Sequence, residues 1–481
     1  MLFNSYSFIL IFLPLTLVGY WTIRNHAPAR YARLWLLAAS FVFYTMWQPG
    51  YTLILLASIG YNYYLSRQLH HARRTDSAYC RFILIIGIAF NLVVIAYFKY
   101  SAFIAMNVLM RSFEYFDALA VALPLGISFF TFQQIAYLVD VSKGKVKTSS
   151  LTEYALFVTF FPQLIAGPIV HHSEMMPQFK DMPSEGKTGR RLAHGLTFFI
   201  IGLFKKVVIA DNISLFADRI FNAPSFDGMT AMQAWQGALA YSFQIYFDFS
   251  GYSDMAIGLA LMFGIRLPYN FNSPYRAVSI VDFWRRWHIT LSRFLRDYVY
   301  IPLGGNRQGK ARRYLNLFLT MLLGGLWHGA NWTFVIWGAL HGVYLIVNHV
   351  WMALCKKLGL PEMKRWWAVM PAAGITFLAV TISWVFFRAT SFGDALAILG
   401  AMGGGNGLGT PKPILLLLLA AWPVLYFLPN SQQLIDRVRS AETLVPVRWR
   451  PSLPWAGAFA VTFVFTMTQL SNVSAFLYFN F

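Results

Sequence analysis

Charged residues are scarce in this chain. They make up 12% of its 481 residues, about half of the roughly 25% found in soluble domains. Hydrophobic residues supply 57%, and many fall in apolar runs close to the roughly 20 residues that a helix needs to cross a bilayer. Such runs lie at 8–23, 34–47, 82–98, 119–139, 367–387 and 455–470. We therefore expect an all-α polytopic membrane protein with about eleven or twelve transmembrane helices and no separate soluble domain.

Several chemical signatures are missing as well. The only two cysteines, Cys80 and Cys355, stand beside basic loops that we assign to the reducing cytoplasm, so a disulfide is not expected. The sequence contains no H-E-x-x-H, no CxxC pair and no histidine–carboxylate cluster at ligand spacing, which argues against zinc. It has no G-x-S-x-G elbow and no phosphate-binding GxxxxGKS/T loop, which argues against a serine hydrolase and an ATP-driven pump. We expect no bound metal and no bound cofactor.

Basic residues outnumber acidic ones by 39 to 19, but they do not form the single stripe that is typical of nucleic-acid binding. They gather in short loops, such as 24–33, 67–81 and 143–147, whereas the intervening turns at 48–50 and 112–117 are neutral or acidic. Basic loops mark the cytoplasmic side of a membrane protein. We therefore expect both termini outside the cytoplasm, contact with membrane lipids and no nucleic-acid partner.

A polar stretch interrupts the apolar pattern between about residues 245 and 313. It contains Asp248 and Ser250, and it also contains Pro268, Pro274 and Pro302, which would end or interrupt helices. Irregular polar backbone at membrane depth persists only where it is buried in protein or lines a wet cavity. The stretch is therefore predicted to form the wall of a cavity.

Residues 280–296 within that stretch follow a helical period. Trp284 and His288 are four residues apart, as are Asp282 and Arg286, so we expect one amphipathic helix with an ion pair between the last two. A helix lying in the membrane interface, with its arginines toward lipid phosphate, explains the basic residues. It does not explain His288.

One histidine lies in the middle of an apolar run, in "GGLWHGANW" at 324–332. An ionisable residue there is costly, and it suggests a function by default. The flanking glycines would allow a backbone or a ligand to approach closely, and Trp327 and Trp332 would exclude water. A neutral imidazole at His328 can then accept and return a proton near neutral pH. A satisfied core histidine is the alternative, and the spacing does not choose between them.

His341 lies thirteen residues after His328. On one unbroken helix the two side chains would be about 220° apart, so they would not share a face. We expect His341 to be a packed or interfacial residue.

These segments together resemble the membrane-bound O-acyltransferases (MBOAT), in particular the bacterial branch of alginate O-acetylation, peptidoglycan O-acetylation and teichoic-acid D-alanylation proteins. The resemblance runs from end to end in family order, and it is specific for the family but much less so for the substrate. The matching segments are "MLFNSYSFILIFLPL" (1–15), "LPLGISFFTFQQIAYLVDV" (123–141), "FPQLIAGPI" (161–169), "YFDFSGYSDMAIGLALMFG" (246–264), "DFWRRWHITLSRFLRDYVYIPLGGNR" (282–307), "LGGLWHGANWTFVIWGALHG" (323–342) and "FLYFNF" (476–481).

The resemblance implies a single membrane domain over residues 1–481, built as a ring of helices around a central funnel with re-entrant or interfacial helices. Its catalytic core would cover about 120–350, and 454–481 would supply a last span and an extracytoplasmic aromatic tail. His328 is implied as the catalytic residue and His288 as its partner. The residues expected in the substrate funnel are Trp327, Asn331, Asp248, Ser250 and Trp284.

The implied activity is membrane O-acetylation of a cell-envelope or exported polysaccharide of the alginate, peptidoglycan or cellulose type. The donor would be a cytoplasmic acyl thioester, acetyl-CoA before others, and D-alanyl transfer is the alternative. His328 would act as general base, and His288, Trp327 or a backbone amide would stabilise the oxyanion. The resemblance also implies a bacterial inner-membrane location and an extracytoplasmic partner acyltransferase.

The final residues, "FLYFNF", read F-x-Y-x-x-F and resemble a motif that a separate small membrane protein carries in teichoic-acid D-alanylation. This suggests that the Tyr478 hydroxyl first receives the acyl group and passes it outward. The alternative is an aromatic tail that only anchors at the interface.

Two other classes of function compete with the enzyme. A transporter of a glycan or acyl carrier would line its pathway with the same polar residues, and a scaffold for partner enzymes would use His328 structurally. The lack of an evident half-and-half repeat and the extent of the resemblance favour the enzyme.

Overall fold

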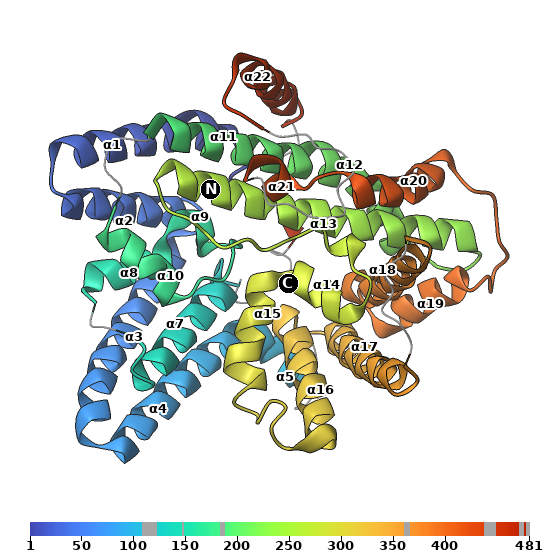
Figure 1. Ribbon diagram of the computed structural model, residues 1–481, viewed down its shortest axis with the longest axis horizontal. Helices are drawn as coiled ribbons and strands as arrows, with labels where there is room; N and C mark the ends of the chain where they lie inside the picture. Colours follow the sequence, from blue (N-terminus) through green and yellow to red (C-terminus); the bar gives the residue numbers. More distant parts are fainter. Residues whose placement is uncertain are drawn as a thin grey trace. The chain divides into compact units, whose positions relative to one another are not determined.

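The computed structural model describes residues 1–107, 123–146, 149–182, 188–359, 366–436, 449–470 and 476–477. Every regular element within these ranges is a helix and none is a strand, which confirms the all-α prediction (Figure 1). The chain divides into two compact units. The first comprises Met1–Leu203, Tyr252–Pro268 and Phe459–Phe479, and the second comprises Phe204–Gly251, Tyr269–Ala458 and Asn480–Phe481.

The first unit is dominated by the N-terminal helices. Its elements are a π-helical turn Phe8–Phe12, α1 Leu13–His26, α2 Ala29–Thr45, α3 Pro49–Thr75, α4 Ser77–Ile95, a π-helical turn Ala96–Tyr100, α5 Ser101–Asn107, α7 Ile127–Ser142, α8 Leu151–Thr159, α9 Phe161–Leu164, α10 His172–Lys180 and α11 Thr188–Phe204, which ends at the boundary of the unit. Helices α3, α4 and α7 pack against one another (Figure 1). Asp76 caps α4 by accepting hydrogen bonds from the amides of Ala78 and Tyr79, which satisfies two donors at the helix start.

Helix α7 lies in the core of this unit. It has 16 residues, and almost all of them are buried, including the polar Gln133 and Gln134. A helix can be buried among other helices of a membrane protein, and residues 119–122 lie outside the described residues. The transmembrane helix predicted at 119–139 therefore stays a prediction.

The second unit carries the polar stretch and the helices that follow it. Its elements are a π-helical turn Lys205–Ala210, α12 Asp211–Phe221, a 3-10 turn Pro274–Arg276, α14 Ile280–Arg286, α15 Ile289–Leu295, a π-helical turn Arg296–Tyr300, α16 Gly309–His328, α17 Trp332–Lys357, α18 Trp366–Arg388, α19 Phe392–Met402, α20 Pro413–Phe427 and α21 Ser431–Ile435. Two helices contribute to both units, α13 Ala231–Met262 and α22 Leu453–Thr468.

Six helices among the described residues are long and apolar enough to cross a membrane. They are Phe8–His26, Ser77–Ala105, Thr188–Phe221, Trp332–Lys357, Val369–Arg388 and Pro413–Ile435, and two shorter apolar helices are Phe392–Met402 and Leu453–Thr468. The runs predicted at 8–23, 82–98 and 367–387 are therefore confirmed as candidate transmembrane helices. The total of eleven or twelve stays a prediction.

The helix predicted over 280–296 is wrong in one respect, because it is broken in the middle. Helix α14 ends at Arg286, Trp287 is extended, and His288 has a φ of 42° before α15 begins at Ile289. The left-handed conformation is rare outside glycine, although histidine adopts it more readily than most residues. The expected ion pair within α14 is present, because Nε of Arg286 lies 2.9 Å from Oδ1 of Asp282.

Candidate functional site

The hairpin of α16 and α17 positions His328. Helix α16 ends at His328, and after three intervening residues α17 begins at Trp332. Asn331 caps its first turn, because its side-chain oxygen accepts from the Thr333 amide at 3.1 Å. Nδ2 of Asn331 donates to the carbonyl of Thr390 at 2.9 Å. The amide therefore stabilises this turn, and its part in a substrate funnel stays a prediction.

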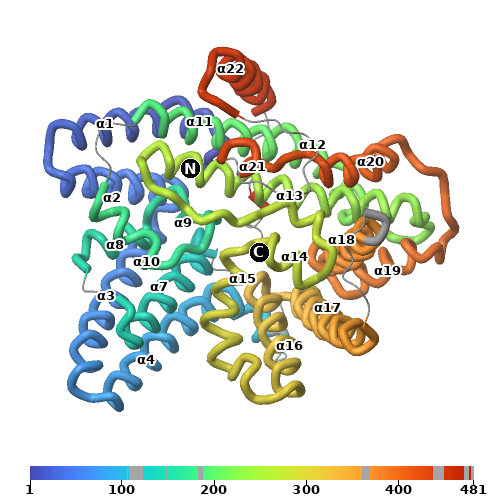
Figure 2. Tube along the Cα trace, in the orientation of Figure 1, coloured from blue at the N-terminus to red at the C-terminus, as the bar shows by residue number. Residues whose placement is uncertain are grey.

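The glycines around His328 allow the two helices of the hairpin to touch. A β-carbon at Gly325 would overlap the carbonyl oxygen of Phe334, and one at Gly329 would overlap the Phe334 ring. Close backbone approach is thus the role of these glycines. Helices α16 and α17 lie side by side as a result, in the yellow-to-orange part of the trace (Figure 2).

Aromatic rings surround the imidazole of His328, which is 4% exposed. The ring centroids of Trp327, Trp337 and Phe387 lie 4.8, 5.1 and 5.1 Å from that of His328. Trp332, which was expected to exclude water there, is 53% exposed. That expectation is wrong because α17 begins at Trp332, and Trp337 of the same helix packs against the histidine instead.

His341 is a fully packed residue, as predicted. Nε1 of Trp284 donates to Nδ1 of His341 at 3.2 Å, and Oγ of Ser383, which donates to the Val380 carbonyl at 2.7 Å, lies 3.0 Å from Nε2 of His341. Because the indole is only a donor and the hydroxyl proton is already committed, the proton of His341 must be on Nε2. Both ring nitrogens are thus engaged, and His341 connects α14, α17 and α18.

His341 and His328 both contact the indole of Trp337. The ring centroid of Trp337 lies 4.8 Å from that of His341 and 5.1 Å from that of His328. Trp284 reaches the same cluster, with its centroid 5.9 Å from that of Trp337. The sequence held a signal for Trp337, because it is four residues before His341 on α17 and so shares its face.

His288 is held by the side chain of Asn270. Nδ1 of His288 lies 3.1 Å from Oδ1 of Asn270, and that oxygen also accepts from the amide and the hydroxyl of Thr290, at 3.3 and 2.9 Å. The Thr290 amide can only donate, so the Asn270 atom must be the carbonyl oxygen and Nδ1 of His288 must carry the proton. Nε2 is therefore the basic nitrogen of this ring.

Burial affects the charge of His288. The residue is 0% exposed, and desolvation lowers its pKa from 6.5 to about 3, because the charged imidazolium is disfavoured away from water. His288 is consequently neutral throughout the physiological pH range.

Trp327 is a neighbour of both His288 and His328. Its ring centroid is 6.3 Å from that of His288 and 4.8 Å from that of His328. Phe249 also packs against His288 in an edge-to-face arrangement, with centroids 4.7 Å apart and planes at 88°. The structure thus brings His288, Trp327 and His328 into one aromatic cluster.

Asp248 forms a buried ion pair. Its Oδ1 lies 2.6 Å from Nζ of Lys206, which is also 2.8 Å from Oδ1 of Asp211. The side chains of Lys206 and Asp248 are 4% and 2% exposed. Sequence reasoning missed Lys206, because the two residues are far apart in the chain and only the fold pairs them. Ser250 is buried as well, and its hydroxyl has no hydrogen-bond partner among the described residues.

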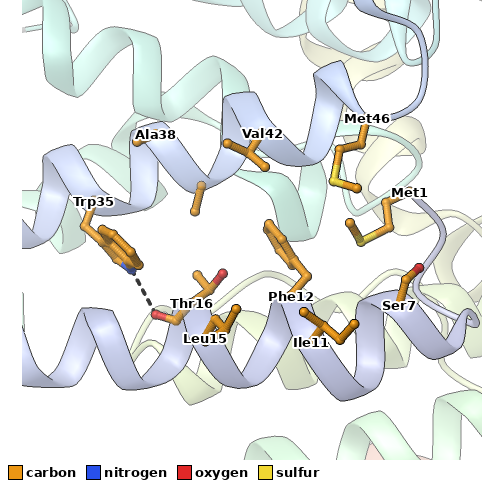
Figure 3. A pocket seen from close by; sticks show the side chains of 11 residues that line it. Met1, Ser7, Ile11, Phe12, Leu15, Thr16, Trp35, Ala38, Val42 and Met46 are labelled. Atoms are coloured by element: carbon orange, nitrogen blue, oxygen red, sulfur yellow. Dashed lines mark hydrogen bonds between the residues drawn. The ribbon is translucent and has the colours of Figure 1, made fainter.

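A cavity of about 320 Å³ lies between α1 and α2 in the first unit, and Figure 3 shows it from close by. Its lining is almost entirely apolar, with Phe12, Trp35 and Met46 among the side chains that face it. Nε1 of Trp35 donates across the cavity to the Thr16 carbonyl at 3.0 Å. Among the described residues, Ser7 and Thr16 are the only polar side chains that line it apart from the Trp35 indole, and no histidine or acidic side chain does, so the histidine cluster is the better candidate for the reaction centre.

The described residues contain no group of three or more histidine, cysteine or acidic side chains that could hold a metal ion. Tyr478, the residue expected to receive the acyl group, lies outside the described residues.

Comparison with known proteins identifies a family over the part of the chain that contains His288 and His328. The model of the MBOAT, membrane-bound O-acyltransferase, family matches residues 83–390. A peptidoglycan O-acetyltransferase of Helicobacter pylori is 46% identical over 85% of this chain and 80% of its own length. A probable alginate O-acetylase AlgI of Azotobacter vinelandii is 44% identical over 84% of this chain and 78% of its own. A teichoic acid D-alanyltransferase of Streptococcus thermophilus is 28% identical over 55% of this chain and 68% of its own.

Proposed function

The chain belongs to the membrane-bound O-acyltransferase family, and we propose that it transfers an acetyl group from a cytoplasmic thioester to a cell-envelope or exported polysaccharide. Membership makes it an O-acyltransferase, and its apolar helices make it a multi-pass membrane protein. The names of the relatives that match over more than four-fifths of the chain, a peptidoglycan O-acetyltransferase and alginate O-acetylases, support acetyl as the acyl group. The D-alanyltransferase matches a smaller part of the chain at lower identity.

The observation that carries the proposal is the burial of His328 in an aromatic cage at the end of α16. His328 removes the proton from the acceptor hydroxyl, and the oxygen attacks the thioester carbonyl carbon. The tetrahedral intermediate collapses with cleavage of the C–S bond, and the thiolate takes the proton back from His328. The rings around the imidazole exclude water, which would otherwise compete as the nucleophile.

His288 is proposed as the partner residue. With its proton held on Nδ1 by Asn270, the basic Nε2 is a hydrogen-bond acceptor, so this neutral tautomer orients a hydroxyl or thiol and does not donate to an oxyanion. The indole N–H of Trp327, whose ring is a neighbour of both histidines, is the better donor for the developing negative charge.

Tyr478 is proposed as the first acceptor. Its phenol oxygen takes the acetyl group with loss of its proton to His328, and the resulting ester is then attacked by a polysaccharide hydroxyl, which restores the phenol. Support comes from the F-x-Y-x-x-F pattern of the tail. We further propose acetyl-CoA as donor, the bacterial inner membrane with both termini extracytoplasmic as location, and an extracytoplasmic acyltransferase as partner.

The test uses purified protein with labelled acetyl-CoA, and it follows release of thiol and transfer of label. His328→Ala should lower transfer by about a thousand-fold, His288→Ala should also impair it, and His26→Ala, at an exposed position, is the matched control. Retained transfer in folded His328→Ala would refute this mechanism, whereas absence of transfer by the folded wild-type protein would favour a transporter or scaffold. Activity with a D-alanyl thioester in place of acetyl-CoA would reassign the acyl group.

A further inference from the structure

The first residue of the C-terminal motif is seated inside the first unit. We propose that the rings of Tyr252 and Phe3 form a binding site for the ring of Phe476, which we call the socket. We propose that this socket anchors the tail and so limits the positions from which Tyr478 can react. The inference rests on the proposed function for what Tyr478 does, but the socket itself stands on contacts among described residues.

The socket is a continuous stack of three rings. The ring of Phe476 is stacked on that of Tyr252, with centroids 4.7 Å apart and planes at 29°. Tyr252 is stacked in turn on Phe3, with centroids 4.8 Å apart and planes at 20°. The three residues are 2%, 4% and 1% exposed. Stacked pairs of this kind contribute beyond the area they bury, so Phe476 is held by its ring and not only by the covalent chain.

The far end of the stack is anchored in the protein core. Phe3 packs against Phe8 and Phe43, with centroids at 5.0 and 5.5 Å. The N-terminal segment and the last helix are also tied together, because the Tyr6 hydroxyl donates to the Met467 carbonyl at 2.7 Å. The socket is thus assembled from both ends of the chain and from the α13 residue Tyr252.

A tail that only rests at the membrane interface would keep its aromatic rings at the surface. Phe476 is instead buried between protein side chains. Its seating fixes one point of the tail relative to the first unit. A fixed attachment point is the positional restraint that an acyl-carrying tail needs in order to react repeatedly from one geometry.

The anchoring is tested directly with carboxypeptidase and intact-mass spectrometry on the purified full-length protein. Digestion of the wild type should stop before Phe476 is removed. Tyr252→Leu removes the stacking partner, and loss of Phe476 should then become about ten-fold faster. Tyr252→Phe, which keeps the ring, should restore protection, and Phe82→Ala, which changes an exposed ring on α4 (58% exposed), is the matched control. Equal digestion of wild type and Tyr252→Leu would overturn the proposal.

The consequence for transfer is measured on the same proteins. Tyr252→Leu and Phe476→Ala should each lower kcat about ten-fold with little change in KM for acetyl-CoA, because the acceptor is misplaced while the donor site is intact. Phe476→Ala alters only the tail, so it tests the socket even if Tyr252→Leu fails to fold. Unchanged kcat in Phe476→Ala would overturn the positional role.

The failure of this proposal is distinguishable from failure of the relay. If Tyr478→Phe transfers acetyl at the wild-type rate while Phe476 stays protected from carboxypeptidase, the relay is wrong and the socket is retained. If Phe476 is removed as readily from the wild type as from Tyr252→Leu, the socket is wrong whatever Tyr478 does.

Discussion

Nδ1 of His288 donates a hydrogen bond to Oδ1 of Asn270 across 3.1 Å, and this bond decides which ring nitrogen is basic. Asn270 can hold that orientation because Thr290 donates to the same oxygen through both its amide and its hydroxyl. The left-handed backbone of His288 places the ring where this is possible. His288 thus combines a strained backbone conformation with a ring proton that is held in a hydrogen bond. Backbone strain of this kind is common at functional sites.

Replacement of Asn270 should separate binding from chemistry. Asn270→Ala removes the acceptor that fixes the tautomer of His288, so we expect kcat to fall about ten-fold or more while KM for the thioester changes little. Steady-state kinetics with labelled acetyl-CoA measure both constants. In a His288→Ala background, Asn270→Ala should not lower kcat further, because its effect acts through His288. A fall in kcat as large as in the wild-type background would contradict the assignment.

The stability of the protein should fall in acid through His288. Burial lowers the pKa of His288 to about 3 in the folded state, and the unfolded value is about 6.5. Between these values the unfolded chain binds more protons, so the free energy of unfolding decreases as the pH falls from about 6.5 toward 3. His288→Asn should make this decrease shallower, and asparagine tolerates the left-handed backbone.

Thermal unfolding in detergent at pH 7.5, 6.5, 5.5 and 4.5 measures the effect, with His26→Asn as the matched control. Parallel pH curves for wild type and His288→Asn would contradict a neutral, buried His288. The experiment needs no substrate, so it is independent of the proposed reaction.

Removing one partner of the Lys206–Asp248 ion pair should lower the free energy of unfolding more than removing both partners. Lys206→Met leaves the Asp248 carboxylate, 2% exposed, without this cation, and an uncompensated buried charge costs about 3–5 kcal/mol. The double variant Lys206→Met/Asp248→Asn should recover most of that loss. Denaturant or thermal unfolding of both single variants and the double variant gives the coupling, and strictly additive losses would show that the pair contributes nothing as a pair.

The sequence predicted some of these features and could not predict others. His328 was identifiable because an imidazole in an apolar run is costly, and the pair Asp282–Arg286 followed from helical spacing. The break at His288 could not be predicted, because helical periodicity indicates which face a side chain occupies. It does not indicate that a single residue adopts the left-handed conformation. The pair of Lys206 and Asp248 depends on tertiary packing, which local patterns do not contain.

Two tryptophans near His328 provide the sharpest contrast between sequence and structure. Both follow the histidine in the same apolar segment, but Trp337 packs against His328 with centroids 5.1 Å apart, whereas Trp332 is 53% exposed. The difference arises because α17 starts at Trp332, which fixes the face that each indole occupies. Only one of them can exclude water from the imidazole.

Trp337→Phe should therefore uncouple cleavage of the thioester from acetyl transfer, whereas Trp332→Phe should not. The smaller ring leaves space beside His328, and water that enters competes with the acceptor hydroxyl for the thioester. We expect the ratio of acetyl-CoA hydrolysis to acetyl transfer to rise about ten-fold in Trp337→Phe. Simultaneous measurement of thiol release and labelled acceptor gives this ratio for both variants. An equal ratio in the two would mean that the aromatic cage does not protect the reaction, and that its role is to hold α16, α17 and α18 together.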